Sequence, residues 1–339
     1  MKLLITTIAY EPKTGGIETH TKLLAQYLRD LGHEVVIVTK TTSNLKEDSE
    51  WKIYRKPTPY QAWRCYAEAD QIIQNNFSIK LGWPLLFYSD RTVIIHHTWL
   101  NDGSLRAKLL LPFKQFLCSF SAQFSNSKVI ANRLWAKSIV IGNPYDDRIF
   151  YNRKEIEPQK NVVVVGRLVY DKGIDIAIKA FFKVLHHYPE TKLTIIGEGN
   201  EENRLKNLVK EMGIGRSVNF LGVLKGNELA EVYASHQVCL IPSRWEEPFG
   251  IVALEALACG CRVVYSRVGG LSEALGEQGT SFANESIEEC AVGIQDSMRQ
   301  GKYSTHQWEE IKKHLEQFRC DVYFKNLFEL MRDHRGIKL

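Results

Sequence analysis

The stretch that decides the fold is Asn-Val-Val-Val-Val-Gly-Arg-Leu-Val-Tyr-Asp-Lys-Gly, residues 161–173. Four consecutive valines predict a buried strand that ends at Gly166. Residues 175–187 then carry apolar side chains at helical spacing. Strand, loop and helix in this order form the repeating unit of a parallel α/β sheet.

The same alternation extends through both halves of the chain. Further strands are predicted at residues 2–9, 34–39, 92–96, 138–141, 192–196, 218–221, 238–241 and 262–265. Residues 144–160 between the halves are polar and lack apolar periodicity, which predicts a linker. The fold class is therefore α/β, with two Rossmann-like domains facing each other across a cleft at their strand carboxyl ends.

Composition indicates an ordinary globular protein with enough length for two domains. Of its 339 residues, 44% are hydrophobic and 24% are charged, and no run of eighteen apolar residues predicts a membrane span. The apolar N-terminus has no small-residue cleavage site and favours a first strand over a signal peptide. The seven cysteines are scattered, which predicts reduced thiols and a cytoplasmic location.

The positive charge is concentrated in the first part of the chain. Residues 1–150 carry 19 Lys and Arg against 13 Asp and Glu, whereas the remainder carries 25 against 26. No nucleic-acid motif accompanies this excess, so an anionic membrane surface or an anionic acceptor is the expected partner. Residues 105–117 mix basic and apolar side chains, which fits either a helix on an anionic leaflet or a core helix with snorkelling lysines.

Two carboxylates flank a turn at the start of a predicted helix. Glu247 opens Glu-Pro-Phe-Gly, and Glu255 follows eight positions later. Free N–H groups at a helix start favour an anion, and carboxylates accept hydrogen bonds from hydroxyl groups. A nucleotide sugar is anionic in the middle and rich in hydroxyls at both ends; a solvated helix cap is the alternative.

Two cations follow the valine strand at the expected cleft. Arg167 and Lys172 suit a diphosphate, although solvated surface cations would give the same pattern. Gly15 and Gly16 lie between the first strand and the first helix, where they allow either a close phosphate approach or a plain tight turn.

His96 and His97 end a strand of the first half, and adjacent strand residues face opposite ways, so at most one can face the cleft. A structural histidine is the ordinary alternative. No residues have metal-ligand spacing, and no Asp-x-Asp pair ends a strand, so we expect no metal and no other cofactor.

These motifs resemble those of retaining glycosyltransferases of the GT-B fold, family 4 (glycosyltransferase group 1). The resemblance covers nearly the whole chain. Its segments are the Gly-Gly loop, GRLVYDKG (166–173), GEGNEENRL (197–205), FLGVLKGNELAEVYA (220–234) and PSRWEEPFGIVALEALACGCRVVYSRVGG (242–270).

The resemblance implies roles for individual residues. Arg167 and Lys172 would stabilise the diphosphate, Glu247 would contact the transferred sugar, and Glu255 would bind the ribose hydroxyls. His97, one residue past the strand, is preferred to His96 as the histidine near the reacting sugar. The implied donor-binding residues are Gly15, Gly16, Gly166, Gly197, Val223, Leu224, Phe249, Gly250, Ile251 and Glu255.

It also implies an activity and a domain plan. Residues 1–143 would bind the acceptor, 161–318 the nucleotide sugar, and a helix in 319–339 would pack back on the first domain. The chain would move a hexose from a nucleoside diphosphate sugar to a glycan hydroxyl, with retention, forming an α linkage. Together with the one-sided positive charge and residues 105–117, this makes a lipid-linked, lipopolysaccharide or capsule precursor at the inner face of the plasma membrane the expected acceptor. A nucleotide-sugar epimerase and a non-catalytic nucleotide-sugar-binding protein remain alternatives.

One departure from the family pattern concerns the end of the first domain. Asn143-Pro144 stands where the family commonly has Asn-Gly, so the geometry there is not carried over. The donor base, the sugar and the acceptor are not specified by the sequence.

Overall fold

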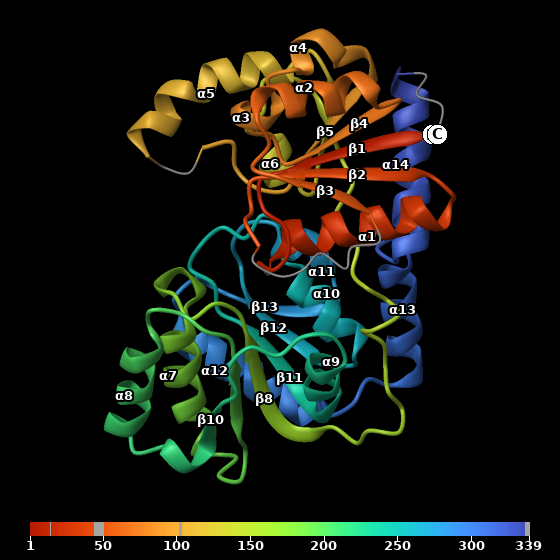
Figure 1. Cartoon of the computed structure of the whole chain (residues 1–339). Coiled ribbons are helices and arrows are strands. Elements are labelled where there is room, and N and C mark those ends of the chain that lie inside the picture. The colour runs from red at the N-terminus through yellow and green to blue at the C-terminus, as the bar shows by residue number, and fades with distance from the viewer. Residues whose placement is uncertain (14, 44–50, 102–103, 336–339) are drawn as a thin grey trace. The chain divides into compact units, whose positions relative to one another are not determined.

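A computed structural model of the chain describes residues 1–13, 15–43, 51–101 and 104–335, with side chains to residue 333. The chain divides into two compact units. The first comprises Met1–Pro144 and Cys320–Leu339, and the second comprises Tyr145–Arg319. Each unit contains one parallel sheet with helices on both faces (Figure 1), which confirms the predicted α/β class.

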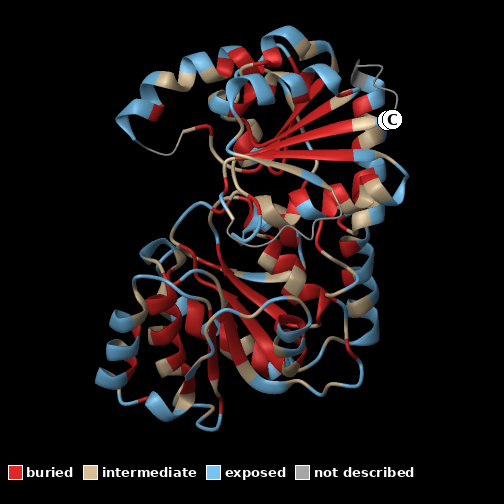
Figure 2. Cartoon of the chain, in the orientation of Figure 1, coloured by how far each residue is buried: buried red, intermediate tan, exposed pale blue. Residues whose placement is uncertain are grey.

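The first unit is built on a seven-stranded sheet in the order β3-β2-β1-β4-β5-β6-β7. Its strands are β1 (Lys2–Thr7), β2 (Glu34–Thr39), β3 (Lys52–Arg55), β4 (Gln71–Asn75), β5 (Thr92–His96), β6 (Ala122–Ser125) and β7 (Ser138–Val140). All pairs are parallel, and Leu3 lies opposite Val35 while Ile5 lies opposite Ile37. The five inner strands β2, β1, β4, β5 and β6 are almost fully buried (Figure 2), as expected of a sheet covered on both faces.

Helices from both ends of the chain cover this sheet. They are α1 (Gly16–Asp30), α2 (Pro59–Glu68), α3 (Ile79–Gly82), α4 (Leu85–Tyr88), α5 (Leu105–Cys118), α6 (Lys128–Ala131) and α14 (Cys320–Arg335). Leu24 of α1 and Phe324 of α14 belong to one buried cluster with Ile5 and Ile73 of the strands. The last helix is therefore part of the first unit although its sequence follows the second (Figure 1).

The second unit has a six-stranded sheet in the order β10-β9-β8-β11-β12-β13. Its strands are β8 (Gln159–Val165), β9 (Leu193–Ile196), β10 (Val218–Phe220), β11 (His236–Ile241), β12 (Arg262–Ser266) and β13 (Gly279–Phe282). Its helices are α7 (Ile174–Leu185), α8 (Glu202–Glu211), α9 (Gly226–Ser235), α10 (Ile251–Ala258), α11 (Leu271–Leu275), α12 (Ile287–Gln300) and α13 (Thr305–Glu316).

The valine run explains how this sheet is covered on both faces. Val162 and Val164 pack into the cluster beneath α7 and α12, whereas Val163 packs into the opposite cluster with α10 and α13. Successive strand residues face opposite sides, so a strand buried on both faces needs apolar residues at every position.

Several segments differ from the sequence-based expectations. Residues 159–160 of the predicted linker begin β8, and Tyr145 and Phe150 are buried in the core of the second unit. Strands β3, β4, β6 and β13 were not predicted. Strand β3 is a half-exposed edge strand, and β4 ends in the buried polar residues Gln74 and Asn75, so neither shows a clear apolar pattern.

The strand orders place a switch point in each unit. In the first, β1 and β4 are neighbours; in the second, β8 and β11 are neighbours, and the crossovers run to opposite sides of each pair. Ligands of open α/β sheets bind outside the strand carboxyl ends at such points. The loops after β1, β8 and β11 start at these points, and they contain half of the predicted site residues.

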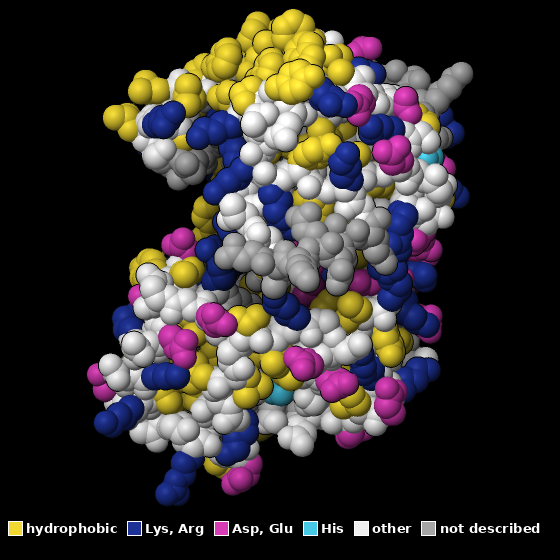
Figure 3. Space-filling model, in the orientation of Figure 1, with side chains coloured by type: hydrophobic (Ala, Val, Ile, Leu, Met, Phe, Trp, Pro, Cys, Tyr) yellow, Lys and Arg dark blue, Asp and Glu magenta, His cyan; other side chains and the backbone are white. Residues whose placement is uncertain are grey.

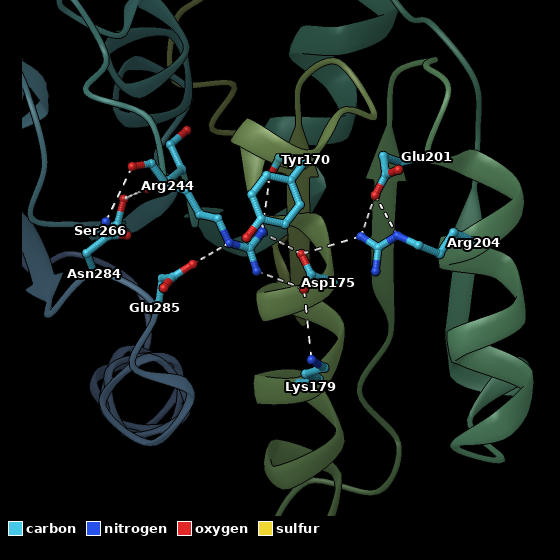
Figure 4. Close-up of polar contacts among 10 residues, drawn as sticks. Tyr170, Asp175, Lys179, Glu201, Arg204, Arg244, Ser266, Asn284 and Glu285 are labelled. Carbon is cyan, nitrogen blue, oxygen red and sulfur yellow. Dashed lines mark hydrogen bonds and ion pairs between the residues drawn. The ribbon is translucent and has the colours of Figure 1, made fainter.

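An ionic network ties two of these loops together (Figure 4). Arg244, in the loop after β11, donates two hydrogen bonds to Asp175 of α7, at 2.7 and 2.8 Å, and one to the Tyr170 carbonyl at 3.1 Å. Its guanidinium lies over the Tyr170 ring and also pairs with Glu285. Burial by itself would raise the pKa of Asp175, but the hydrogen bonds and charge of Arg244 lower it below its ordinary value.

We expect Asp175→Asn to destabilise the protein because it leaves Arg244 without its bidentate partner in a largely buried site. The free energy of unfolding should fall by about 3 kcal/mol, as measured by denaturant titration. A carboxyl with a lowered pKa stabilises the fold above its unfolded pKa. The loss of unfolding free energy relative to the wild type should therefore be largest at neutral pH. It should shrink as the pH falls through the lowered pKa of Asp175.

The matched control is Asp171→Asn, which removes the same charge from an exposed residue nearby. Its effect should stay within about 0.5 kcal/mol. Equal losses in the two variants, or a difference that does not depend on pH, would contradict the role of the Arg244–Asp175 pair.

Candidate functional site

The loops after β8 and β11 bring together two residues that are far apart in the sequence. Lys172 Nζ donates a hydrogen bond to Glu247 Oε1 at 2.5 Å, and Ser243 Oγ donates to the same oxygen at 2.6 Å. Glu247 is 8% exposed, while the Lys172 side chain is 23% exposed. A charged pair therefore lies at the switch point, with its cation partly exposed to solvent.

Two helix N-termini lie beside this pair. Helix α7 is capped by Gly173 and α10 by Gly250; both glycines have left-handed backbone, and neither cap has a side-chain hydrogen bond. Lys172, Ile174, Glu247, Gly250 and Val252 line one small pocket. Helix N-termini without side-chain caps leave backbone N–H groups available, so this pocket suits an anion.

Glu255 lies on α10, in the second turn after Gly250. Some of its surface is accessible, but dense protein surroundings raise the pKa of its carboxyl to about 7, and Asp146 contributes to this shift. No hydrogen bond engages this side chain among the residues that the structure describes. An unpaired, poorly solvated carboxyl of this kind gains by accepting hydrogen bonds from a ligand's hydroxyls.

The predicted residues Gly166, Arg167 and Gly197 meet where β8 and β9 end. Gly197 has φ +138°, and a Cβ there would overlap the Gly166 carbonyl, so the two backbones are in direct contact. The Arg167 side chain is exposed and forms no ion pair within the described part of the chain. A cation in this state is available for a ligand.

The remaining predicted donor residues of the second unit are divided between surface and core. Val223 is 43% exposed, and Leu224 packs against the core near the loop whose Gly222 accepts a hydrogen bond from Gly197. Phe249, in contrast, is 2% exposed and packs edge-on against Phe318. Its side chain is a core anchor for the turn, so only its backbone is suited to ligand contact.

Two glycines that were not singled out from the sequence set the position of Glu247. Gly270 N donates to the Glu247 carbonyl at 2.6 Å. Gly269 has φ +61°, and a Cβ on it would overlap the backbone of Glu247. The Val-Gly-Gly sequence that follows β12 is therefore required for its backbone to approach that of Glu247 closely. In a sequence, a glycine pair after a strand can indicate such a close backbone approach.

In the first unit, His97 lies at the strand carboxyl ends within a buried polar cluster. Its Nε2 lies 2.5 Å from Asn75 Oδ1, and the Asn143 side-chain amide lies 3.0 Å from its Nδ1. Because the Asn75 amide nitrogen donates to Thr21, its oxygen accepts from Nε2–H of His97. Burial lowers the pKa of His97 to about 3, so the ring is neutral at physiological pH.

Of the other predicted residues of this unit, the two glycines lie near that cluster and His96 does not. Gly15 caps α1 without a side chain and Gly16 is its first residue, and Asn75 also reaches the carbonyl of Ile17 in that first turn. The Gly-Gly loop and His97 are thus brought together. His96, in contrast, bonds to Gln123 at 3.0 Å inside the sheet, so it has a structural role.

Several residues at both switch points were missed by sequence reasoning. Asn75, Asn143 and His20 surround His97. Ser243 donates to Glu247, and Arg244 in the same loop pairs with Asp175. The polar end of an otherwise apolar strand is the signal that could have indicated Asn75. No local pattern indicates His20, which is a polar residue on the buried face of α1.

Three further observations concern metal ligands, cysteine thiols and membrane-spanning helices. No three His, Cys, Asp or Glu side chains are grouped as metal ligands among the described residues, and metal independence stays a prediction. Cys259 and Cys261, which flank a glycine, are buried free thiols. Throughout the ranges that the structure describes, each helix is too short or too polar to cross a bilayer.

Curated relatives of this chain include several glycosyltransferases. One, an uncharacterized glycosyltransferase (MJ1607) of Methanocaldococcus jannaschii, is 28% identical over 81% of this chain and 83% of its own length. The phosphatidylinositol N-acetylglucosaminyltransferase gpi3 subunit of Schizosaccharomyces pombe is 26% identical over 83% of this chain and 69% of its own length.

A solved structure has the same fold. The Anabaena protein Alr3699/HepE, in complex with UDP-glucose, superposes with a TM-score of 0.80 over 98% of this chain and 100% of that chain, at 20% identity.

Two family models together match most of the chain. The model for glycosyl transferases group 1 matches residues 146–314, and the model for glycosyltransferase family 4 matches residues 14–147. The boundary between the two matches coincides with the boundary between the structural units. The chain belongs to the family 4, group 1 glycosyltransferases of the GT-B fold.

Proposed function

We propose that this glycosyltransferase moves a sugar from a nucleoside diphosphate sugar to a hydroxyl of a lipid-linked glycan, with retention and an α linkage. The observation that carries the proposal is the group formed by Lys172, Glu247 and the glycine-capped N-termini of α7 and α10. It combines donors for an anion with an acceptor for hydroxyl groups.

The donor's parts match the chemistry of this group. The diphosphate would lie against Lys172, Arg167 and the free helix N–H groups, whereas Glu247 and Glu255 would accept hydrogen bonds from the sugar and ribose hydroxyls. Because Glu247 pairs with Lys172, a bound diphosphate would compete for the lysine and turn Glu247 toward the sugar. The relative solved with UDP-glucose supports a donor of this class.

Charge stabilisation would supply much of the rate. The cations and helix N-termini would stabilise the negative charge that develops on the departing diphosphate. A phosphate oxygen would accept the proton of the attacking hydroxyl on the same face of the sugar. Neither glutamate then acts as a nucleophile, and no metal ion is needed to hold the diphosphate.

Two observations support a lipid-linked acceptor at the inner face of the plasma membrane. One relative is named as an N-acetylglucosaminyltransferase of phosphatidylinositol, which is a lipid. The basic excess of the chain also lies in the part that forms the first unit, where it would favour anionic lipids.

The proposal is tested by identifying the donor and the stereochemistry of the product. A thermal-shift screen of UDP, GDP, ADP and CMP sugars should find a donor that adds about 2.7 kcal/mol of stability at ~100 times its Kd. Proton NMR of the product formed from an α-linked donor should show an α-anomeric coupling. A β product would overturn retention, and an epimerised donor formed without acceptor would overturn transfer.

Lys172→Ala should reduce turnover much more than donor binding because its charge matters most as the diphosphate departs. We expect kcat to fall about 10²–10³-fold, while the donor Kd from calorimetry changes far less. The control, Lys210→Ala, removes an exposed lysine of the same unit and should leave both constants unchanged. Near-normal turnover in Lys172→Ala would rule out this role.

Gly269→Ala should displace Glu247 because the added methyl group overlaps its backbone. We expect turnover to fall about 10²-fold. Gly213 has a similarly positive φ of +70°, but a Cβ there would meet no atom within 4 Å, so Gly213→Ala tests positive-φ strain in the same unit without the clash. Comparable activity in the two variants would show that contact with Glu247 is unimportant.

A further inference from the structure

Helix α5 of the first unit has two different faces. Ala107, Gln115 and Cys118 are buried, and Leu117 packs with Leu85 of α4 in a core cluster. The opposite face carries large apolar side chains that are exposed to solvent: Leu105 (75% exposed), Leu109 (74%), Phe113 (48%) and Phe116 (52%), followed by Phe120 (41%). We call these five residues the α5 stripe.

The stripe is continuous along the helix. With about 100° of rotation per residue, the four members on the helix fall within an arc of about 80°, and the Phe120 ring packs edge-on against Phe116 with 5.0 Å between the ring centroids. On the neighbouring α4, Leu86 and Phe87 are also exposed, at 50% and 64%. Figure 3 shows hydrophobic side chains gathered over α2, α4 and α5, with Lys and Arg along the edge of this surface. Neighbouring large apolar side chains that are exposed together often mark a site of contact with a protein or a membrane.

The charges on either side of the α5 stripe indicate which kind of partner it binds. Arg106 and Lys108 are both exposed and, from the helical rotation, lie on opposite sides of the stripe. The helix contains no Asp or Glu. A second copy of the same face would therefore bring like charges together, whereas a layer of anionic headgroups above acyl chains complements both the cations and the stripe.

We propose that the α5 stripe inserts into the surface of an anionic lipid bilayer, with Leu86 and Phe87 of α4 beside it and Arg106 and Lys108 against the headgroups. This deepens the proposed function, on which its biological role rests, because it would hold the first unit against the membrane that contains a lipid-linked acceptor. The binding itself depends on the surface alone.

The test is co-sedimentation of the full chain with vesicles of phosphatidylcholine alone, or of phosphatidylcholine with phosphatidylglycerol. We expect binding to the anionic vesicles that weakens as salt rises. Leu109→Ser with Phe113→Ser should weaken it at least ~10-fold, and Arg106→Ala with Lys108→Ala about fivefold for each cation removed. All four positions are exposed, and circular dichroism would check that the variants fold.

Matched controls keep the result specific. Val292→Ser changes an equally exposed apolar residue of the second unit, and Lys210→Ala an exposed lysine there, so neither should alter binding. Absence of binding by the wild type, or equal binding by Leu109→Ser/Phe113→Ser, would overturn the proposal. A dimer that these substitutions dissociate, without vesicle binding, would instead identify an interface between copies and also overturn it.

Donor binding distinguishes this proposal from the proposed function. The stripe variants should keep the thermal shift with the nucleotide sugar, because no stripe residue belongs to the second unit. If the protein binds vesicles but no nucleotide sugar shifts its melting temperature, the membrane-binding proposal is supported and the proposed function fails. If a nucleotide sugar shifts the melting temperature but the protein does not bind vesicles, the proposed function is supported and the membrane-binding proposal fails.

Discussion

The ion pair between Lys172 and Glu247 connects the loops on either side of the switch point between β8 and β11. Seventy-five positions separate the two residues in the sequence. Their contact depends on the parallel pairing of β8 with β11, on the Arg244–Asp175 clamp and on the close approach of Gly269 and Gly270. None of these supports bonds to the side chain of Lys172 or Glu247, so they hold the loops in place without engaging the two charged groups.

The two units present different kinds of polar group at their strand carboxyl ends. The second offers charges and free helix N–H groups, which suit an anionic ligand. The first has a buried neutral cluster in which His97 is oriented by Asn75 and Asn143. Desolvation keeps this imidazole uncharged, so it contributes hydrogen bonding and shape and not charge.

Helix α5 shows why a mixed basic and apolar segment is ambiguous in sequence. The prediction left open a core helix or a membrane-surface helix, and each description fits one face. Ala107, Gln115 and Cys118 are core residues, whereas the α5 stripe faces outward. Because apolar residues surround most of the helix, periodicity alone cannot say which of them other elements cover.

The sequence by itself determined the α/β class, the strand–loop–helix unit at residues 161–173 and the family, because strands buried on both faces and glycine-bounded loops leave strong local patterns. It did not reveal β4, because polar residues at its buried end interrupt the apolar run. Tertiary structure decided that Lys172 pairs with Glu247, that His96 lies inside the sheet while His97 joins the polar cluster, and that Phe249 anchors the core. Those outcomes depend on contacts between distant segments, which strand order and close backbone packing create and which no local pattern encodes.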